Sequence, residues 1–507
     1  MWIRFKNVLV GGLLVGALLS GKTVVALSAS ITELPRGIEP QPSLAAAGCE
    51  ESDLIKDRAV VRAKLEAQLM ELVEDCSKKK LFATRTALYE LVLEFDPENV
   101  EAKKGLGYKK QKDGSWTLKP RRMAPKDKSA SLAEEIEAQK KEALTVYAEH
   151  LLAVLKSYES VASKENRELL MSDVLAVDPN NAVVREARGE TLLEEDWVLK
   201  ETAIAKQRRA ELKDFVRAAF ASLPPLAAVE PTPREAAFGL PWSVVISTPV
   251  GRTLGTASKA EIEKLSQAMW VTRSYFNDTL GARGTLPKEL TVYSFGAPAD
   301  GLVFVDKHPD VDEDYRAFLK TLEGSGIQGT GDFAQWAPNE QRRLDGLVRQ
   351  AVAWLFAGAY EIFPKHGWVF EGFGLYLTRE IAGTRLTWFV GPSSTLDAQS
   401  EQELRDRLME PTTNWMNEAF LILQAPGRPN LKKLLEKGVN ELTPEDLLYS
   451  YVLAAYLIEA EAPHVPELLR TIGKGKSSVL AIQAELKTQI PELEDRILRW
   501  LSERLAR

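Results

Sequence analysis

Histidine is scarce in this chain of 507 residues. The four histidines are His150, His308, His366 and His464. None of them has another histidine three or four residues away, which is the spacing that places two ligands on one helix face. The sequence therefore contains no ordinary histidine-based metal motif, and we expect no metal or other cofactor.

Cysteine is scarcer still, with only Cys49 and Cys76. Neither has a histidine close by, so the pair does not form a structural zinc site. In an oxidising compartment the two could form a disulfide, and otherwise they are two free thiols. The sequence leaves both alternatives open.

An excess of basic charge is also lacking, since 65 Lys and Arg stand against 72 Asp and Glu, for a net charge of -7. Phosphate backbones need a clustered basic surface, so nucleic acid is excluded as the main partner. No G-x-S-x-G elbow offers a serine nucleophile. At 45% hydrophobic and 27% charged residues, the composition suits two or three globular domains.

The one marked apolar run lies at the N-terminus. Arg4 and Lys6 precede an apolar segment at residues 8–21, and small residues follow at 26–29. This order predicts a signal peptide over residues 1–28, followed by a flexible spacer over 29–49. We expect export to the periplasm or the cell exterior. An uncleaved membrane anchor is the alternative, although the run is short for a span of about 20 residues.

Residues 50–222 have a predominantly helical pattern that contains an internal repeat. The tetrapeptides at 96–99 and 178–181 both begin Asp-Pro, and each precedes a glycine by the same number of residues, Gly107 and Gly189. Trp116 and Trp197 follow. Asp-Pro should end one helix and open the next, the glycine should end that helix, and the tryptophan should lie on a short hairpin.

This pattern resembles tetratricopeptide-type helical repeats, and its continuation resembles a repeat common in exported bacterial proteins of unknown function. The resemblance implies a binding surface, while simple scaffolding is the alternative interpretation.

A Pro-rich linker is expected at residues 223–241, and the pattern changes after it. Strand-like segments at 242–247 and 290–295 flank a long amphipathic helix, and glycines at 324–331 suit a hairpin rather than a phosphate-binding loop. From about residue 340 the chain is helical. The acids Asp310, Asp312, Glu313 and Asp314 could form a calcium-like cluster, but we interpret them as acids that cap the next helix.

Two successive helices carry the most specific motif. The second begins at Gly367 and contains Trp368, Glu371, Gly372, Tyr376 and Leu377. It resembles the W-x-x-E-G-x-x-x-Y-L segment of gluzincin metallopeptidases of the peptidase MA-like branch, and the order of elements over residues 242–507 is similar too. The resemblance implies an α+β, predominantly helical protein in which a helical repeat region precedes a thermolysin-like domain with a small sheet. It also implies that Glu371 stands at the third zinc-ligand position.

The chain departs from this family on the first motif helix, where H-E-x-x-H is missing. One alignment puts Arg349, Gln350 and Ala353 at its positions, and a shift by one puts Gln350, Ala351 and Trp354 there. We name Arg349, Gln350, Ala353 and Glu371 the vestigial zinc-site positions. A buried carboxylate needs a partner, so we expect Arg349 to pair with Glu371. A solvated or backbone-bonded Glu371 is the alternative.

The sequence thus predicts an exported pseudopeptidase that binds a protein or peptide or acts as a scaffold at the cell envelope. The candidate cleft residues are Trp354, Trp368 and Tyr376. An active hydrolase that uses Glu371 without a metal, or with unforeseen metal ligands, is the rival hypothesis.

Overall fold

The protein is predominantly helical with small sheets, an α+β fold. The computed structural model describes residues 51–118, 125–321, 327–329, 331–388, 390 and 398–506. It divides into an N-terminal unit that ends at Trp197 and a C-terminal unit that starts at Val198. The expected signal peptide (1–28), spacer (29–49) and Cys49 lie outside the described residues.

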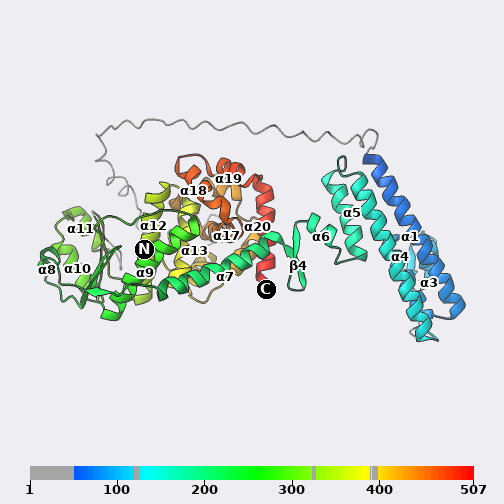
Figure 1. The fold of residues 1–507 in the computed structure, drawn as a ribbon, viewed down its shortest axis with the longest axis horizontal. Coiled ribbons are helices and arrows are strands. Elements are labelled where there is room, and N and C mark those ends of the chain that lie inside the picture. The colour runs from blue at the N-terminus through cyan, green and yellow to red at the C-terminus, as the bar shows by residue number, and fades with distance from the viewer. Residues whose placement is uncertain are drawn as a thin grey trace, which may run out of the picture. The chain divides into compact units, whose positions relative to one another are not determined.

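The N-terminal unit consists of two copies of one series of elements. The elements are α1 (Glu51–Lys79), α2 (Phe82–Phe95), α3 (Val100–Leu106), β1 (Tyr108–Lys110), β2 (Trp116–Leu118), α4 (Ala130–Ser157), α5 (Lys164–Val177), α6 (Ala182–Ala187), β3 (Glu190–Leu193) and β4 (Asp196–Leu199). A long helix, a helix of 14 residues, a short helix and a two-stranded hairpin follow one another twice. The long helices α1 and α4 lie side by side (Figure 1).

The duplication is thus longer than the motif that marks it in the sequence. As expected, the tryptophans Trp116 and Trp197 lie on the second strand of each hairpin. Gly107 caps the end of α3 in the left-handed conformation, and Gly189 follows α6 with a φ of 75°. An ion pair of 2.6 Å between Arg58 and Asp173 links α1 to α5.

The capping residue differs from the expected one. Asp96 and Asp178 end the preceding helices, and it is the fourth residue of each tetrapeptide, Asn99 or Asn181, that accepts the hydrogen bond at the start of the short helix. The two prolines therefore lie between the helices rather than in the first turn. Asparagine serves well at this position because its side-chain oxygen reaches the amide two or three residues ahead.

The C-terminal unit combines one sheet with a large helical bundle. Its helices are α7 (Lys200–Ala221), α8 (Pro233–Ala237), α9 (Lys259–Leu280), α10 (Pro298–Lys307), α11 (Glu313–Leu319), α12 (Glu340–Tyr360), α13 (Gly367–Ala382), α14 (Ala398–Met409), α15 (Trp415–Gln424), α16 (Leu431–Leu434), α17 (Pro444–Ala460), α18 (Val465–Gly473), α19 (Ser478–Leu486) and α20 (Ile490–Leu505). Its strands are β5 (Ala227–Ala228), β6 (Val244–Thr248), β7 (Gly251–Gly255), β8 (Thr291–Ser294), β9 (Ile327–Gly329) and β10 (Asp332–Gln335).

The sheet has the strand order β5-β6-β7-β8-β10-β9. Strands β7, β8 and β10 run parallel, and the remaining neighbours are antiparallel. Helix α9 forms the crossover between β7 and β8, and it packs on β6 and β7 with the apolar face predicted from its spacing. The expected hairpin is present as β9 and β10.

Helix α7 and the Pro-rich stretch differ from the expected domain organisation. The sequence assigned residues 200–222 to the repeat region, but α7 packs on α17 and α9, and its Ala205, Leu212 and Val216 join the core of the C-terminal unit. Residues 223–241 are likewise not a free linker, because they contain β5, which pairs with β6, and α8. The division falls between residues 197 and 198 instead of at 223–241.

Helix α17 is the centre of the bundle. All of its 17 residues are buried, and α13, α7, α15 and α20 pack around it. Thr443 caps its start together with Asp446. Across the described ranges, no helix has both the length and the apolar composition of a membrane span.

The asparagine caps can be tested on the second copy of the repeat. Asn181→Ala removes the acceptor for the amide of Val184 and should destabilise α6 by about 1 kcal/mol. Hydrogen exchange of the α6 amides should therefore become faster. The control is Asn180→Ala, because Asn180 is exposed and makes no cap. Equal exchange in both variants would contradict this assignment of the cap.

Candidate functional site

The vestigial zinc-site positions lie where α12 packs against α13. Helix α13 approaches α17 closely at Gly372, where an added Cβ would lie 2.2 Å from the carbonyl oxygen of Ser450. At Gly374 an added Cβ would lie 2.3 Å from Nη1 of Arg349. These two glycines therefore let α13 approach α17 on one side and accommodate the guanidinium of Arg349 on the other.

The expected ion pair between Arg349 and Glu371 is present. Nη2 of Arg349 lies 2.9 Å from Oε1 of Glu371, and the side chains are 3% and 0% exposed. The same Nη2 donates a hydrogen bond of 2.8 Å to the carbonyl oxygen of Phe370, and the guanidinium lies 4.5 Å from the centre of the Phe370 ring. The alternative of a solvated Glu371 is therefore wrong.

The residues at these positions do not fit a zinc ion. Zinc in a peptidase takes three protein ligands and a water, whereas Gln350 and Ala353 supply no imidazole or carboxylate. The one carboxylate at the position, Glu371, already contacts a cation. A divalent ion beside the same oxygen would meet the positive charge of Arg349 in a buried environment, where like charges repel strongly. Gln350 and Ala353 themselves are half-buried on α12.

The candidate cleft residues belong to the protein interior. Trp368 is fully buried, and its Nε1 donates to Oγ of Ser478 at 2.9 Å. Trp354 is half-buried and packs edge-on against Phe333 on β10. These contacts support the helices and the sheet. The two pockets that the described residues form most clearly are not lined by Arg349, Glu371, Trp354, Trp368 or Tyr376.

Tyr376 belongs to a buried polar cluster that the sequence did not predict. Its hydroxyl lies 2.9 Å from Oε1 of Glu459, a residue of α17 with no exposed surface. Arg504 from α20 forms an ion pair with the same carboxylate, and Arg209 from α7 lies 4.0 Å from it. Burial raises the pKa of Tyr376 well above its ordinary value, so the phenol stays protonated and can donate to Glu459.

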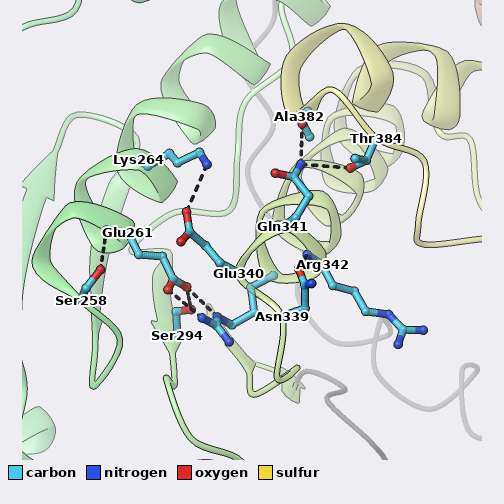
Figure 2. A network of polar contacts seen from close by, with 11 residues as sticks. Ser258, Glu261, Lys264, Ser294, Asn339, Glu340, Gln341, Arg342, Ala382 and Thr384 are labelled. Carbon is cyan, nitrogen blue, oxygen red and sulfur yellow. Dashed lines mark hydrogen bonds and ion pairs between the residues drawn. The ribbon is translucent and has the colours of Figure 1, made fainter. Parts of the chain in front are cut away.

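A second buried network fixes α12 to the sheet side of the unit. Arg343 holds Glu261 of α9 through two contacts, Nε to Oε1 at 2.6 Å and Nη2 to Oε2 at 2.7 Å. Oγ of Ser294, at the end of β8, lies 3.3 Å from the same carboxylate. Figure 2 shows Glu261 directed toward Ser294, while Arg342, the residue before Arg343 on α12, points away from them. All charges of this network are paired, so it positions helices rather than offering a reactive group.

One group with the composition of a metal site lies near the start of β10. His308, Asp310 and Asp332 bring ligand atoms within 4.8 Å of one another. Arg234 already occupies this place, with Nη2 at 2.6 Å from Asp310 and 2.8 Å from Asp332. The amide of Asp310 donates to Nδ1 of His308, which leaves Nε2–H to donate to Asp332. We therefore interpret this group as a structural ion-pair cluster.

The acids next to it behave as the sequence indicated. Asp312 caps α11 by accepting a hydrogen bond of 2.7 Å from the amide of Tyr315, and Glu313 and Asp314 follow in the first turn. Asp310 is the exception because it pairs with Arg234, which is 76 residues away in sequence. No local pattern signals that contact.

The thiol of Cys76 is fully buried, and burial raises its pKa to about 11. It is therefore protonated at neutral pH and unsuited to nucleophilic chemistry.

Comparisons with models of known protein families and with curated proteins find no match to this chain.

The buried ion pair gives a clear expectation for stability. Glu371→Ala leaves the guanidinium of Arg349 buried without its carboxylate and should lower the free energy of unfolding of the C-terminal unit by about 3 to 5 kcal/mol. Arg349→Met together with Glu371→Leu removes both charges and should cost less than Glu371→Ala. Urea unfolding measures these changes, with Arg342→Ala, an exposed position on α12, as the control. If the double variant loses as much stability as Arg349→Met and Glu371→Leu lose together as single variants, the two charges do not interact.

Glu380, in the last turn of α13, gives an expectation for pH. Burial raises the pKa of Glu380 above its ordinary value, and this effect outweighs the lowering of the pKa by the positive charge of Arg379. The negative charge of Glu459 adds to the increase. The folded protein thus holds this proton more tightly than the unfolded chain. The resulting stabilisation is fully present below the unfolded pKa and is lost as pH rises through the folded pKa.

Glu380→Gln should therefore stabilise the protein most at neutral pH, and its advantage should shrink as pH falls below the pKa of the folded state. Urea unfolding over a series of pH values measures this difference, and Glu436→Gln, at an exposed position, is the matched control. An advantage of the same size at every pH would contradict the assignment of Glu380.

Proposed function

We propose that the C-terminal unit is a non-catalytic relative of the gluzincin metallopeptidases. The observation that carries this proposal is the ion pair between Arg349 and Glu371. On the resemblance of the α13 segment to the W-x-x-E-G-x-x-x-Y-L motif, Glu371 stands at the third zinc-ligand position. A guanidinium at 2.9 Å supplies the positive charge that zinc would supply in an active relative.

The contact also supports one of the two alignments of the first motif helix. In the first alignment Arg349 takes the place of the first histidine, which faces the third ligand in an active peptidase. In the second alignment that place belongs to Gln350. The ion pair of Arg349 with Glu371 favours the first alignment. The order of β6, β7, α9, β8, the β9–β10 hairpin, α12 and α13 agrees with a thermolysin-like arrangement.

The protein then acts by binding. We propose that it is exported, to the periplasm or the cell exterior, and that it binds a protein or peptide or serves as a scaffold at the cell envelope. The sequence of the first 28 residues supports export. The duplicated helical unit supports binding, because tandem helical units of the tetratricopeptide kind that it resembles commonly present an extended surface to a partner.

The rival hypothesis, a hydrolase that uses Glu371, has less support. A general base or a metal ligand must reach the substrate or the ion, and Glu371 has no exposed surface. It is also held by the buried cation Arg349. Its use in catalysis would require α12 and α13 to separate.

Zinc content and proteolysis test the proposal together. The purified mature protein, dialysed with zinc and then washed, should hold far less than one zinc per chain and should not hydrolyse casein. Stoichiometric zinc that is lost in Glu371→Ala would overturn the proposal in favour of the hydrolase.

The same chain provides a positive control. Arg349→His, Gln350→Glu and Ala353→His together rebuild H-E-x-x-H in front of Glu371, and this variant should bind about one zinc per chain. The matched control rebuilds the motif one residue later, with Gln350→His, Ala351→Glu and Trp354→His, and should not bind zinc. If a folded first variant fails to bind zinc, the placement of Glu371 at a zinc-ligand position is wrong.

A further inference from the structure

A pocket of about 820 Å³ lies in the C-terminal unit, away from the vestigial zinc-site positions. It lies beside the first residues of two parallel strands, Gly251 and Arg252 of β7 and Thr291 of β8. The loop that follows α9 and the start of α8 complete it. Its charged lining residues are Arg234, Glu235, Arg252, Arg273, Lys288 and Glu289.

Two of the cations in this lining are neutralised by carboxylates. Arg252 is held by Glu235 through Nε at 2.9 Å and Nη2 at 2.8 Å. Glu235 is 3% exposed and also closes the capping box of α8, so this pair forms a rigid wall. Arg234 is engaged by Asp310 and Asp332.

The other two cations are available. Within the described ranges, neither Arg273 nor Lys288 forms an ion pair or a side-chain hydrogen bond. Arg273 is half-buried on α9, and Lys288 is exposed on the loop before β8. An arginine that is partly removed from water and lacks a carboxylate partner favours an anion from outside, because its planar guanidinium can donate two parallel hydrogen bonds.

The hollow continues past Arg273. A smaller pocket of about 240 Å³ shares Val250 and Arg273 with the first, and it is also lined by Trp270, Ser274 and Asn277. A ligand with its charge at Arg273 can therefore place an apolar or aromatic group beside Trp270. The amide and hydroxyl of Asn277 and Ser274 add polar contacts there, although Asn277 is already bonded to Gly284.

We propose that this pocket binds a carboxylate-bearing peptide segment, with Arg273 and Lys288 holding the carboxylate. The charge of the lining selects this chemistry. The two cations without a partner, Arg273 and Lys288, outnumber the one lining acid that has no cation partner, Glu289, so this part of the lining favours an anion, and the proposed peptide partner can supply it as a carboxylate. The volume of the first pocket is in the range of about 300–1,000 Å³ that ligand sites occupy.

This inference deepens the proposed function and rests on it, because it assigns a site to the peptide or protein partner. The experiment uses the full mature protein and a hexapeptide of alternating glutamate and leucine that has an amidated C-terminus and carries an uncharged fluorophore. Binding is followed by fluorescence anisotropy at low and at physiological ionic strength. A neutral peptide with glutamine in place of glutamate is the reference ligand.

The acidic peptide should bind more tightly than the neutral one, and its affinity should fall as the salt concentration increases. Arg273→Gln should weaken its binding by about tenfold or more, since about 1.4 kcal/mol corresponds to that factor. Lys288→Gln, at an exposed loop position, should weaken binding less and should fold normally. Lys432→Gln, an exposed position on α16, is the control and should leave binding unchanged.

Equal affinity for both peptides, or affinity unaltered in Arg273→Gln and Lys288→Gln, would overturn the inference. Displacement experiments with inorganic phosphate separate the two anion sources, and a site that holds phosphate but neither peptide would also overturn it. The measurement needs no zinc and no hydrolysis. A protein found to be a zinc hydrolase would refute the proposed function while the effect of Arg273→Gln on peptide binding remained, so the two failures are distinguishable.

Discussion

A buried arginine beside a buried glutamate is the constraint on which the bundle of the C-terminal unit depends. Arg349 and Glu371 are both almost free of solvent contact, and each would be costly to bury alone. Their contact makes the close packing of α12 on α13 acceptable. It also requires the absence of a side chain at Gly374, where the guanidinium lies. Packing thus explains the Glu-Gly-x-Gly string, because Gly374 makes room for the ion pair and Gly372 lets α13 touch the backbone of α17.

Helix α12 is also held on its other side, by a second ion pair between a buried arginine and a buried glutamate. Arg343 binds Glu261 on α9, so α12 is fixed between α9 and α13 by two arginines whose carboxylates come from different helices. A third polar contact, from Asp345 to the hydroxyl of Thr384 and the amide of Leu386, ties α12 to the chain after α13. Apolar packing alone tolerates small sliding of one helix along another. Charged hydrogen bonds have narrow geometry, so these contacts fix the register of α12.

Local features of the structure followed from the sequence, and long-range ones did not. The glycine stops at Gly107 and Gly189 and the tryptophan hairpins each depend on a few adjacent residues, and they were predicted correctly. Asn181 was misjudged because an Asp and an Asn in one tetrapeptide compete for the cap, and only the backbone decides between them. The place of α7 was missed because an amphipathic helix does not encode which core covers its apolar face.

The pairing of Arg349 with Glu371 was predictable because the motif placed the two residues on facing helices. The contact of Arg234 with Asp310 was not predictable, because the two residues lie 76 positions apart and no sequence motif places them together.

Burial and pairing separate the charged residues of this unit into two groups with different roles. Glu371, Glu261 and Glu459 are buried carboxylates, and each is held by an arginine from another helix, so their charges serve the fold. Arg273 has the opposite character, since it lines both pockets and no carboxylate of the described chain engages it. The buried contact between Arg349 and Glu371 consumes the charge of both residues, so it offers no free charge to recognise a ligand. If the unit recognises one, the recognition has to use charge that packing has not consumed, and such charge is found at the amino ends of β7 and β8 rather than between α12 and α13.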